Sequence, residues 1–186
     1  MLAWLTKRSD RLRTARSLYG SIVTRARETV FYAAWGVPDT VQGRFEMIAL
    51  HLVLALHRLG AEGRAGRRLG QALTEVFVVD LDDAMREMTF GDLAVPREVK
   101  RAAAALFDRH RAYLAGLDAP REWALAEAIE AQLAYLDPGQ GLGQGLGKGL
   151  DARSLSDYVR RAASALDGQP ASLILAGQLA WPQPAA

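Results

Sequence analysis

The chain has 186 residues, contains no cysteine and carries 23 basic and 21 acidic side chains, which gives a formal net charge of +2. Half of the residues are apolar and about a quarter are charged, a composition typical of a globular domain rather than a disordered chain. The lack of cysteine excludes disulfides, thiolate metal sites and a cysteine nucleophile. The net charge is too small to indicate nucleic-acid binding by itself.

The N-terminal part of the chain predicts two long helices. Apolar side chains recur at spacings of three and four residues, which predicts a helix over about residues 10–35. The motif Gly36-Val37-Pro38 ends this helix, because proline disfavours helical backbone at the residue before it. Asp39 or Thr40 then caps a second helix by accepting a hydrogen bond from a free backbone N–H group. The second helix is apolar on nearly every side from Met47 to Leu56, which predicts that the Met47–Leu59 helix is the most buried one.

Glycine and proline divide the next residues into three further helices. Residues 60–66 are glycine-rich and predict a loop, and a third helix follows over residues 69–88 with one apolar face. Pro96 fits the first turn of a fourth helix, where the missing N–H group of proline costs nothing. Pro120 opens a fifth helix, which is expected to end at Leu136.

A tandem Gly-Leu-Gly unit dominates residues 137–150. So many glycines with so little charge do not form a packed element, so this segment is predicted to be a flexible linker. After it, Ser154 or Ser156 caps a short helix. Pro170 begins another helix, which is expected to end near Trp181.

No segment shows the sustained alternation of apolar and polar residues that is typical of a strand. The predicted fold is therefore all-α, a single-domain helical bundle of six or seven helices. Residues 1–136 form its main domain and residues 137–150 its linker. Residues 151–186 form C-terminal helices that pack on the main domain.

The sequence shows no residue pattern typical of a catalytic or metal site. His51 and His57 are six residues apart and fall on roughly opposite helix faces, so they cannot bind one metal ion together. His110 lies on an apolar stripe and is expected to be a hydrogen-bonded core histidine. No Glu-x-x-His pair of the di-iron type and no Gly-x-Ser-x-Gly nucleophile motif is present. We therefore predict no catalytic residue, no bound metal and no cofactor.

An acidic cluster on the third helix supports one alternative function. Asp80, Asp83 and Glu87 fall on one helix face, where they could hold Mg²⁺ and a diphosphate, as in helical enzymes of the prenyl-diphosphate type. Such enzymes need a second acidic motif facing the first, and the sequence shows none. Asp82 and Arg86, four residues apart, predict an ordinary helical ion pair. A solvated polar face is the simpler interpretation of this cluster.

Two apolar features exceed what one buried helix stripe requires. Residues 76–79 are four consecutive apolar residues, and Phe31, Tyr32 and Trp35 place aromatic rings around the end of the first helix. Either neighbouring helices surround these residues, or they line an exposed apolar groove that receives a partner segment. The arginine-rich residues 7–16 support a further alternative, a membrane-surface or RNA-binding helical adaptor, provided that the arginines form one contiguous face.

Short motifs in the first part of the chain match one known family. They are Leu18-Tyr19, Ala26-Arg27, Phe31-Tyr32, Gly36-Val37-Pro38-Asp39-Thr40-Val41, Gly43-Arg44-Phe45, Leu50-His51, Asp80-Leu81-Asp82, Met85-Arg86-Glu87, Gly91-Asp92-Leu93-Ala94-Val95-Pro96 and Lys100. On these motifs the chain resembles the ubiquinol–cytochrome c chaperone family, the assembly factors of ubiquinol–cytochrome c reductase. The resemblance is good over residues 12–117 and weak at residues 175–177 and 181–182.

The resemblance implies a protein that is not an enzyme. It implies an assembly factor that binds newly made cytochrome b and promotes assembly of the reductase, with the ribosome or a small partner subunit as further partners and no binding of DNA. The sequence shows no secretory signal and no apolar run of the ~18 residues that span a bilayer, so we expect a cytoplasmic protein, with peripheral contact at the inner membrane compatible with this. The residues expected to contact the partner are Phe31, Tyr32, Trp35, Arg44, His51, Asp82 and Arg86.

Overall fold

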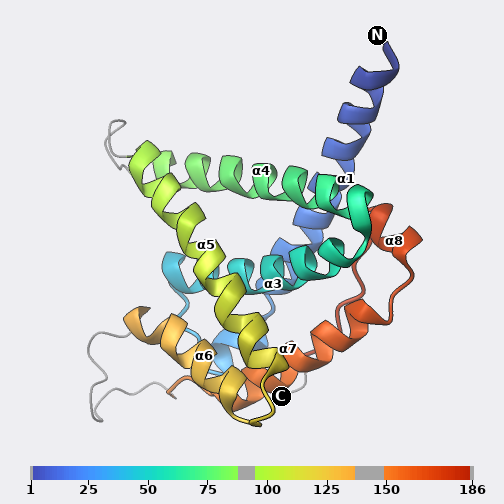
Figure 1. The fold of residues 1–186 in the computed structure, drawn as a ribbon. Coiled ribbons are helices and arrows are strands. Elements are labelled where there is room, and N and C mark those ends of the chain that lie inside the picture. The colour runs from blue at the N-terminus through green and yellow to red at the C-terminus, as the bar shows by residue number, and fades with distance from the viewer. Residues whose placement is uncertain (1, 88–94, 137–148, 185–186) are drawn as a thin grey trace.

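The computed structural model describes residues 2–87, 95–136 and 149–184, and every regular element in these residues is helical (Figure 1). The longer helices are α1 (Leu2–Ala26), α3 (Val41–Ala61), α4 (Gly63–Glu87), α5 (Val95–Asp118), α6 (Ala124–Leu133) and α7 (Ala152–Asp167). Two five-residue helices, α2 (Thr29–Ala33) and α8 (Ala171–Leu175), and the 3-10 turn η1 (Ala134–Leu136) complete the described elements. The all-α bundle expected from the sequence is confirmed.

Helix α3 forms the centre of the bundle. It contacts α1, α4, α5 and α7, which lie around it in Figure 1. All but three of residues 47–59 are buried, and removing such apolar side chains from water is the main favourable term in folding. The hydroxyl of Thr40 caps the helix by accepting a hydrogen bond from the Gly43 N–H at 3.1 Å. Both expectations for this helix, its cap and its burial, are confirmed.

The continuous helix predicted over residues 10–35 is wrong. Helix α1 begins earlier, at Leu2, and ends at Ala26, and the extended backbone of Glu28 separates it from α2. The Tyr32 hydroxyl donates a 2.7 Å hydrogen bond to the Ala26 carbonyl oxygen, so a side chain replaces the backbone donor that a continuous helix would supply. The apolar spacing hides this break because Phe31 returns to the same core as α1.

The loop predicted over residues 60–66 is also wrong. Glu62 alone separates α3 from α4, and Gly63 begins α4 with a φ of 60°, a left-handed value that glycine adopts at little cost. Gly66 packs so closely that a Cβ atom added to it would lie 2.0 Å from the Leu59 carbonyl oxygen. The glycines therefore make a sharp corner between two helices rather than a loop.

The C-terminal helices begin and end at residues other than those expected. Asp151, rather than Ser154 or Ser156, caps α7 by accepting a 3.0 Å hydrogen bond from the Ser154 N–H. This hydrogen bond stabilises the carboxylate and lowers the pKa of Asp151. Helix α8 stops before Gly177, whose φ of 91° ends it, so the helix does not reach Trp181.

A buried arginine attaches α7 to the central helix. The guanidinium of Arg58 on α3 donates hydrogen bonds of 2.8 and 3.0 Å to the carbonyl oxygens of Leu166 and Gln169 at the end of α7, where the helix dipole favours a cation. Residues 137–148 of the predicted linker lie outside the described residues, so its flexibility stays a prediction. No described helix is both long and apolar enough to cross a membrane.

Candidate functional site

A surface cavity of about 530 Å³ opens between α3, α4 and α5, beside η1. In Figure 1, α5 runs from the far end of α4 past α3. Apolar side chains make up most of the wall, and two of them, Val41 and Tyr135, are about half exposed at its rim. The residues that line the cavity are Val41, Gln42, Phe45, Leu81, Met85, Arg101, Ala102, Ala105, Arg109 and Tyr135.

A buried ion pair lies beside this cavity. The carboxylate of Glu46 on α3 is 1% exposed, and the guanidinium of Arg109 on α5 donates to both of its oxygens, with the Nε–Oε2 bond at 2.6 Å. The Tyr135 hydroxyl donates to the same carboxylate, and the Arg109 guanidinium also lies 5.6 Å from the centre of the Phe45 ring. The bidentate hydrogen bonding of Arg109 and the additional hydrogen bond from Tyr135 offset the free-energy cost of removing both charges from water.

Two tyrosines surround the ion pair and keep their protons. Burial raises the pKa of Tyr135, and its hydrogen bond to Glu46 raises it further. Burial also raises the pKa of Tyr113, with the negative charge of Glu46 adding to the effect. The Tyr113 side chain is buried, and its hydroxyl has no hydrogen-bond partner among the described residues. Burying an unpaired hydroxyl costs free energy, so Tyr113 is an unfavourable feature close to an otherwise hydrogen-bonded ion pair.

Three of the residues expected to contact a partner lie inside the core. Phe31, Trp35 and His51 are 0%, 3% and 0% exposed, because α7 and the C-terminal segment cover them. The ring centres of Phe31 and His51 lie 5.1 Å from those of Tyr158 and Trp181, respectively. These three side chains are therefore not exposed at the surface of the folded protein, and their contact with a partner stays a prediction.

The hydrogen bonds of His51 fix its tautomer. Nδ1 lies 2.7 Å from the Met47 carbonyl oxygen, which can only accept, so Nδ1 carries the proton. Nε2 then accepts a hydrogen bond from the Tyr158 hydroxyl at 2.8 Å. Burial disfavours the charged imidazolium and lowers the pKa of His51 to about 4. The residue is a neutral part of the core.

The other four expected contact residues lie at or near the surface. Tyr32 is half-buried, and burial raises its pKa to about 12. Arg44 forms an exposed ion pair of 2.6 Å with Asp39, and Arg86 forms one of 2.7 Å with Asp82. Arg44, Asp82 and Arg86 adjoin cavity-lining residues in sequence. Their contact with a partner stays a prediction.

Comparison with known proteins connects this geometry to a family. A family model described as "Ubiquinol-cytochrome C chaperone" matches residues 33–181, a range that contains every residue of the cavity wall. The chain belongs to this family. The crystal structure of the Cbp3 homolog from Brucella abortus is similar to it, with a TM-score of 0.81 and 32% sequence identity over 99% of this chain and 98% of that one. None of the curated proteins compared with the chain matches it.

The family match also corrects the extent of the resemblance seen in the sequence. That resemblance was best over residues 12–117, whereas the matched region begins at residue 33 and continues to residue 181. The match therefore includes α6, α7 and α8. These helices carry Tyr158, which completes the core around His51, so the matched region contains both partners of this contact, whereas α1 lies outside it.

The sequence analysis did not identify the residues that build the cavity. Arg109 and Tyr135 of the cavity wall, and Glu46 to which both donate, come from three elements far apart in sequence, and no short motif contains them. One signal was available, because Glu46 is a charged residue in a helix that is otherwise apolar. A buried charge requires a partner, but the sequence does not show which arginine supplies it.

The acidic cluster does not form a metal-binding arrangement in the described residues. Asp80 accepts a 2.7 Å hydrogen bond from the Tyr19 hydroxyl, and Asp82 is paired with Arg86. No three His, Cys, Asp or Glu side chains of the described ranges are placed to hold one metal ion. The facing acidic motif that the prenyl-diphosphate alternative requires is not found there.

The expectation for His110 is wrong. It is half-buried rather than in the core, and it lines a shallow cavity of about 320 Å³ between α3, α4 and α5. Phe107, on the wall of the same cavity, is 74% exposed. Burial lowers the pKa of His110, and the proximity of His57 lowers it further. An apolar stripe on α5 therefore includes surface positions that the periodicity does not distinguish.

Proposed function

We propose that this protein is a non-enzymatic chaperone that binds newly made cytochrome b and promotes assembly of ubiquinol–cytochrome c reductase. The observation that carries the proposal is the family match over residues 33–181. The similarity to a Cbp3 homolog over nearly the whole of both chains supports it. Contact with the ribosome or a small partner subunit rests on the resemblance alone.

We propose the cavity of about 530 Å³ between α3, α4 and α5, beside η1, as the contact surface for the client. Its apolar wall suits an apolar helical segment of a membrane protein, because covering such a wall gains roughly 25 cal/mol per Å² of apolar surface removed from water. The Glu46–Arg109 pair is already neutralised and fully bonded. This ion pair fixes the position of α5 against α3. The apolar wall, rather than the ion pair, would then determine which client binds.

Two exposed valines offer a matched test of this surface. Val41 lines the cavity, whereas Val79 on α4 does not, and their side chains are 54% and 60% exposed. Val41→Lys places a charged chain at the cavity rim, where an apolar segment would have to desolvate it. Val79→Lys makes the same chemical change outside the cavity.

The measurement is the amount of assembled reductase in membranes of the native host after deletion of the gene and complementation with each variant. We expect deletion to lower the assembled complex, Val79→Lys to restore it, and Val41→Lys to restore it poorly although both variants fold. Unchanged reductase after deletion would overturn the chaperone proposal. Equal rescue by both variants would leave the chaperone role standing and overturn the assignment to this cavity.

A further inference from the structure

Two tyrosine hydroxyls lie close to one buried carboxylate at the cavity of about 530 Å³, which we call the Tyr135 cavity. The hydroxyl of Tyr135 donates a hydrogen bond to Glu46. Tyr113 lies one helical turn after Arg109 on α5, and long helical side chains lean toward the start of their helix, so its ring is directed toward the ion pair. After burial, the charge of Glu46 is the largest cause that raises the pKa of Tyr113, which places the second hydroxyl near the same carboxylate.

Of these two possible donors, only Tyr135 is hydrogen-bonded. The Tyr113 hydroxyl has no partner among the described residues, although the side chain is only 1% exposed. Arg109 already donates to both oxygens of Glu46, and Tyr135 adds a third hydrogen bond. Tyr113 and Tyr135 therefore compete for the remaining part of one acceptor, and the unpaired hydroxyl is the one that loses.

The two tyrosines differ in their freedom to move. Tyr135 is 51% exposed and lines the cavity, yet it donates to a carboxylate that is 1% exposed, so its hydroxyl covers Glu46 on the cavity side. It belongs to the single turn η1, which packs mainly on α6. Tyr113 belongs to the core. The Tyr135 side chain can therefore turn toward solvent without opening the core, whereas Tyr113 stays buried beside Glu46.

An exchange of donors would offset the departure of Tyr135. If Tyr135 left alone, Glu46 would lose a hydrogen bond to a charged group, which is worth more than one between neutral groups. The Tyr113 hydroxyl is close enough to replace it, and in doing so it gains the partner that it lacks. One hydrogen bond is lost and another forms, and the cost of the buried unpaired hydroxyl disappears.

We propose that Tyr135 is a movable wall of the Tyr135 cavity and that Tyr113 is the reserve donor that replaces it on Glu46. When an apolar client segment enters, the Tyr135 ring leaves Glu46 and packs on the client, and Tyr113 keeps the ion pair with Arg109 hydrogen-bonded. Tyr135 thereby sets the width of the segment that the cavity accepts. The role toward a client rests on the proposed function, whereas the exchange of donors does not.

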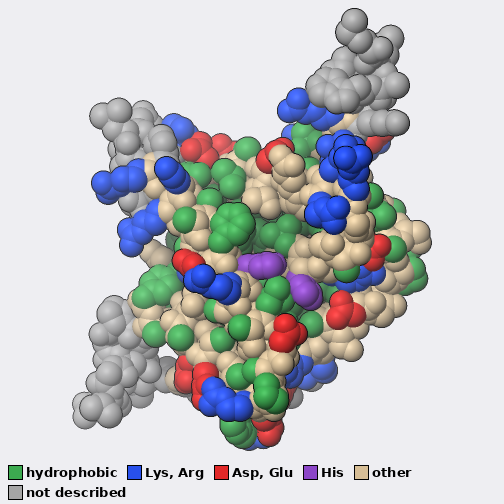
Figure 2. All heavy atoms as spheres, viewed as in Figure 1, with side chains coloured by type: hydrophobic (Ala, Val, Ile, Leu, Met, Phe, Trp, Pro, Cys, Tyr) green, Lys and Arg blue, Asp and Glu red, His purple; other side chains and the backbone are tan. Residues whose placement is uncertain are grey.

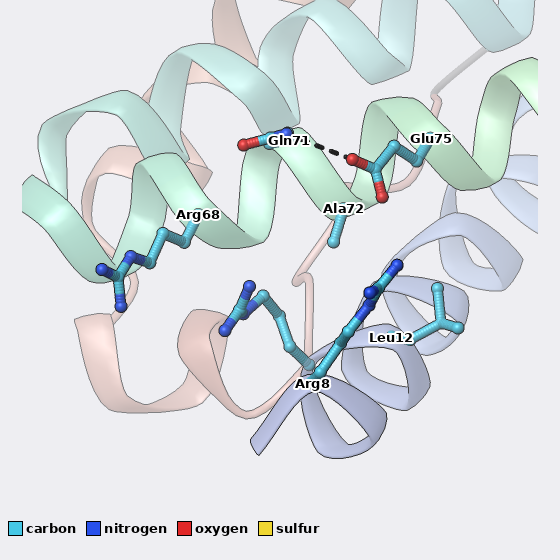
Figure 3. Close-up of a pocket in the computed structure, with 7 residues that line it drawn as sticks. Arg8, Leu12, Arg68, Gln71, Ala72 and Glu75 are labelled. Atoms are coloured by element: carbon cyan, nitrogen blue, oxygen red, sulfur yellow. Dashed lines mark hydrogen bonds between the residues drawn. The ribbon is translucent and has the colours of Figure 1, made fainter. Parts of the chain in front are cut away.

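Two other cavities lined by described residues lack this arrangement. Arginines from both helices line a cavity of about 300 Å³ between α1 and α4, and its carboxylate, Glu75, is exposed and accepts a 3.2 Å hydrogen bond from the Gln71 amide (Figure 3). The cavity of about 320 Å³ that His110 lines has no acidic residue in its wall. Figure 2 shows histidine and apolar side chains together on the face where α5 crosses α3. Neither cavity has two donors beside one buried carboxylate.

A double-mutant cycle on the full chain tests the exchange without any client. The variants are Tyr135→Phe, Tyr113→Phe and the two together, and urea titration gives the equilibrium constant of unfolding for each. We expect Tyr135→Phe alone to raise this constant by less than about threefold, because Tyr113 supplies the missing hydrogen bond. In the Tyr113→Phe background the same substitution should raise it at least about tenfold, because Glu46 then lacks both donors. Equal effects in the two backgrounds would overturn the proposal.

Tyr19→Phe is the matched control for this cycle. It also removes a tyrosine hydroxyl that donates to a carboxylate, that of Asp80 on α4, but it shares no hydrogen-bond partner with Tyr113. Its effect on the unfolding constant should be the same with and without Tyr113→Phe, because sites without a shared partner contribute additively. Coupling of Tyr19 to Tyr113 as strong as that of Tyr135 would show a general loosening of the fold and would overturn the exchange.

Proton NMR detects the new hydrogen bond directly. In Tyr135→Phe we expect the Tyr113 hydroxyl proton to appear as a downfield, slowly exchanging resonance, because the group is buried and donates to a charged acceptor. The resonance is assigned by its loss in the double variant. Absence of this resonance from folded Tyr135→Phe would contradict a reserve donor.

Rescue of reductase assembly in the deletion host tests the role toward the client. We expect Tyr113→Phe to restore less assembled reductase than Tyr19→Phe does, although Tyr113→Phe is the more stable variant, because departure of Tyr135 then leaves Glu46 without a replacement donor. Rescue that follows stability instead would overturn this role. Unchanged reductase after deletion would defeat the proposed function and leave the cycle to decide the exchange, whereas an additive cycle would defeat the exchange and leave the proposed function standing.

Discussion

His51 and Glu46 are both polar residues of α3, lie five positions apart and are almost completely buried, yet the surroundings of the two side chains differ. His51 is neutral, both of its ring nitrogens are hydrogen-bonded, and aromatic rings close around it. Glu46 belongs to an ion pair beside an open cavity, close to the Tyr113 hydroxyl, which has no partner in the described part of the chain.

The difference separates a region that is enclosed by aromatic side chains from one that adjoins the surface cavity proposed as the client contact. Both ring nitrogens of His51 are already hydrogen-bonded, and its side chain is completely buried. The region around Glu46 adjoins a cavity of about 530 Å³ and is stabilised by charge rather than by complete enclosure. Residues far apart in sequence build both regions, so their distinct roles follow from packing and not from the composition of α3.

The largest expected effect comes from breaking the ion pair. Arg109→Met leaves the Glu46 carboxylate buried without its cation, which we expect to lower the free energy of unfolding by about 3–5 kcal/mol in urea titrations. The double variant Glu46→Leu/Arg109→Met removes both charges and is expected to recover most of that loss. Equal losses in the single and double variants would show that packing, and not the unpaired charge, sets the cost.

Acid should weaken the His51 region specifically. Its pKa is about 4 in the folded protein and 6.5 ordinarily, so below pH 6.5 the unfolded chain binds a proton that the folded chain excludes. Stability is therefore expected to fall as the pH drops from 6.5 to about 4, by about 3 kcal/mol from this residue. The measurement is the free energy of unfolding against pH for the wild type and His51→Gln.

The two curves should converge as the pH falls, because the variant lacks the titrating group. His57→Gln changes an exposed histidine of the same helix and serves as the control. Parallel curves for the wild type and His51→Gln would contradict a neutral buried imidazole.

Removing the Tyr158 hydroxyl from the His51 region should destabilise the protein moderately. Tyr158→Phe keeps the buried ring but leaves Nε2 of His51 without its donor. We expect the free energy of unfolding to fall by about 1–2 kcal/mol, the cost of a buried polar atom that loses its partner. Thermal or urea unfolding at neutral pH measures it, and an unchanged midpoint would show that this hydrogen bond contributes nothing net.

A tyrosine-to-phenylalanine substitution beside the ion pair should have the smallest effect, and it should stabilise the protein rather than destabilise it. Tyr113→Phe removes a buried hydroxyl that has no partner among the described residues. We expect the free energy of unfolding to rise by up to about 1 kcal/mol, because the cost of burying that hydroxyl disappears. A loss comparable to that of Tyr158→Phe would remove the distinction between the two regions.

The fold class could be predicted from the sequence because helical periodicity is a local property. The apolar residues on nearly every side of Met47–Leu56 correctly predict a central helix, and of the two predicted caps, Asp39 and Thr40, the structure shows Thr40. The break after Ala26 could not be predicted in this way. It depends on a hydrogen bond from Tyr32 and leaves the apolar spacing unchanged.

The candidate site could be predicted only in part, because helices distant in sequence assemble it. Phe31 and Trp35 suggested an exposed groove, but whether an aromatic ring is exposed depends on α7 and the C-terminal segment, which cover both. The exposure of residues 76–79 could not be predicted from the sequence either. Phe77 is buried while Val79, two positions later, is exposed, a division that a run of four apolar residues does not reveal.

The closure of the aromatic cluster around His51 has a consequence for folding during synthesis. Tyr158, the donor to His51, is added 107 residues after it, and Trp181, which packs on the imidazole, is later still. While the ribosome is making the intervening residues, α3 has one face that its own neighbours cannot cover. Contacts so distant in sequence form late, so the nascent chain itself exposes apolar surface until α7 emerges and completes the core.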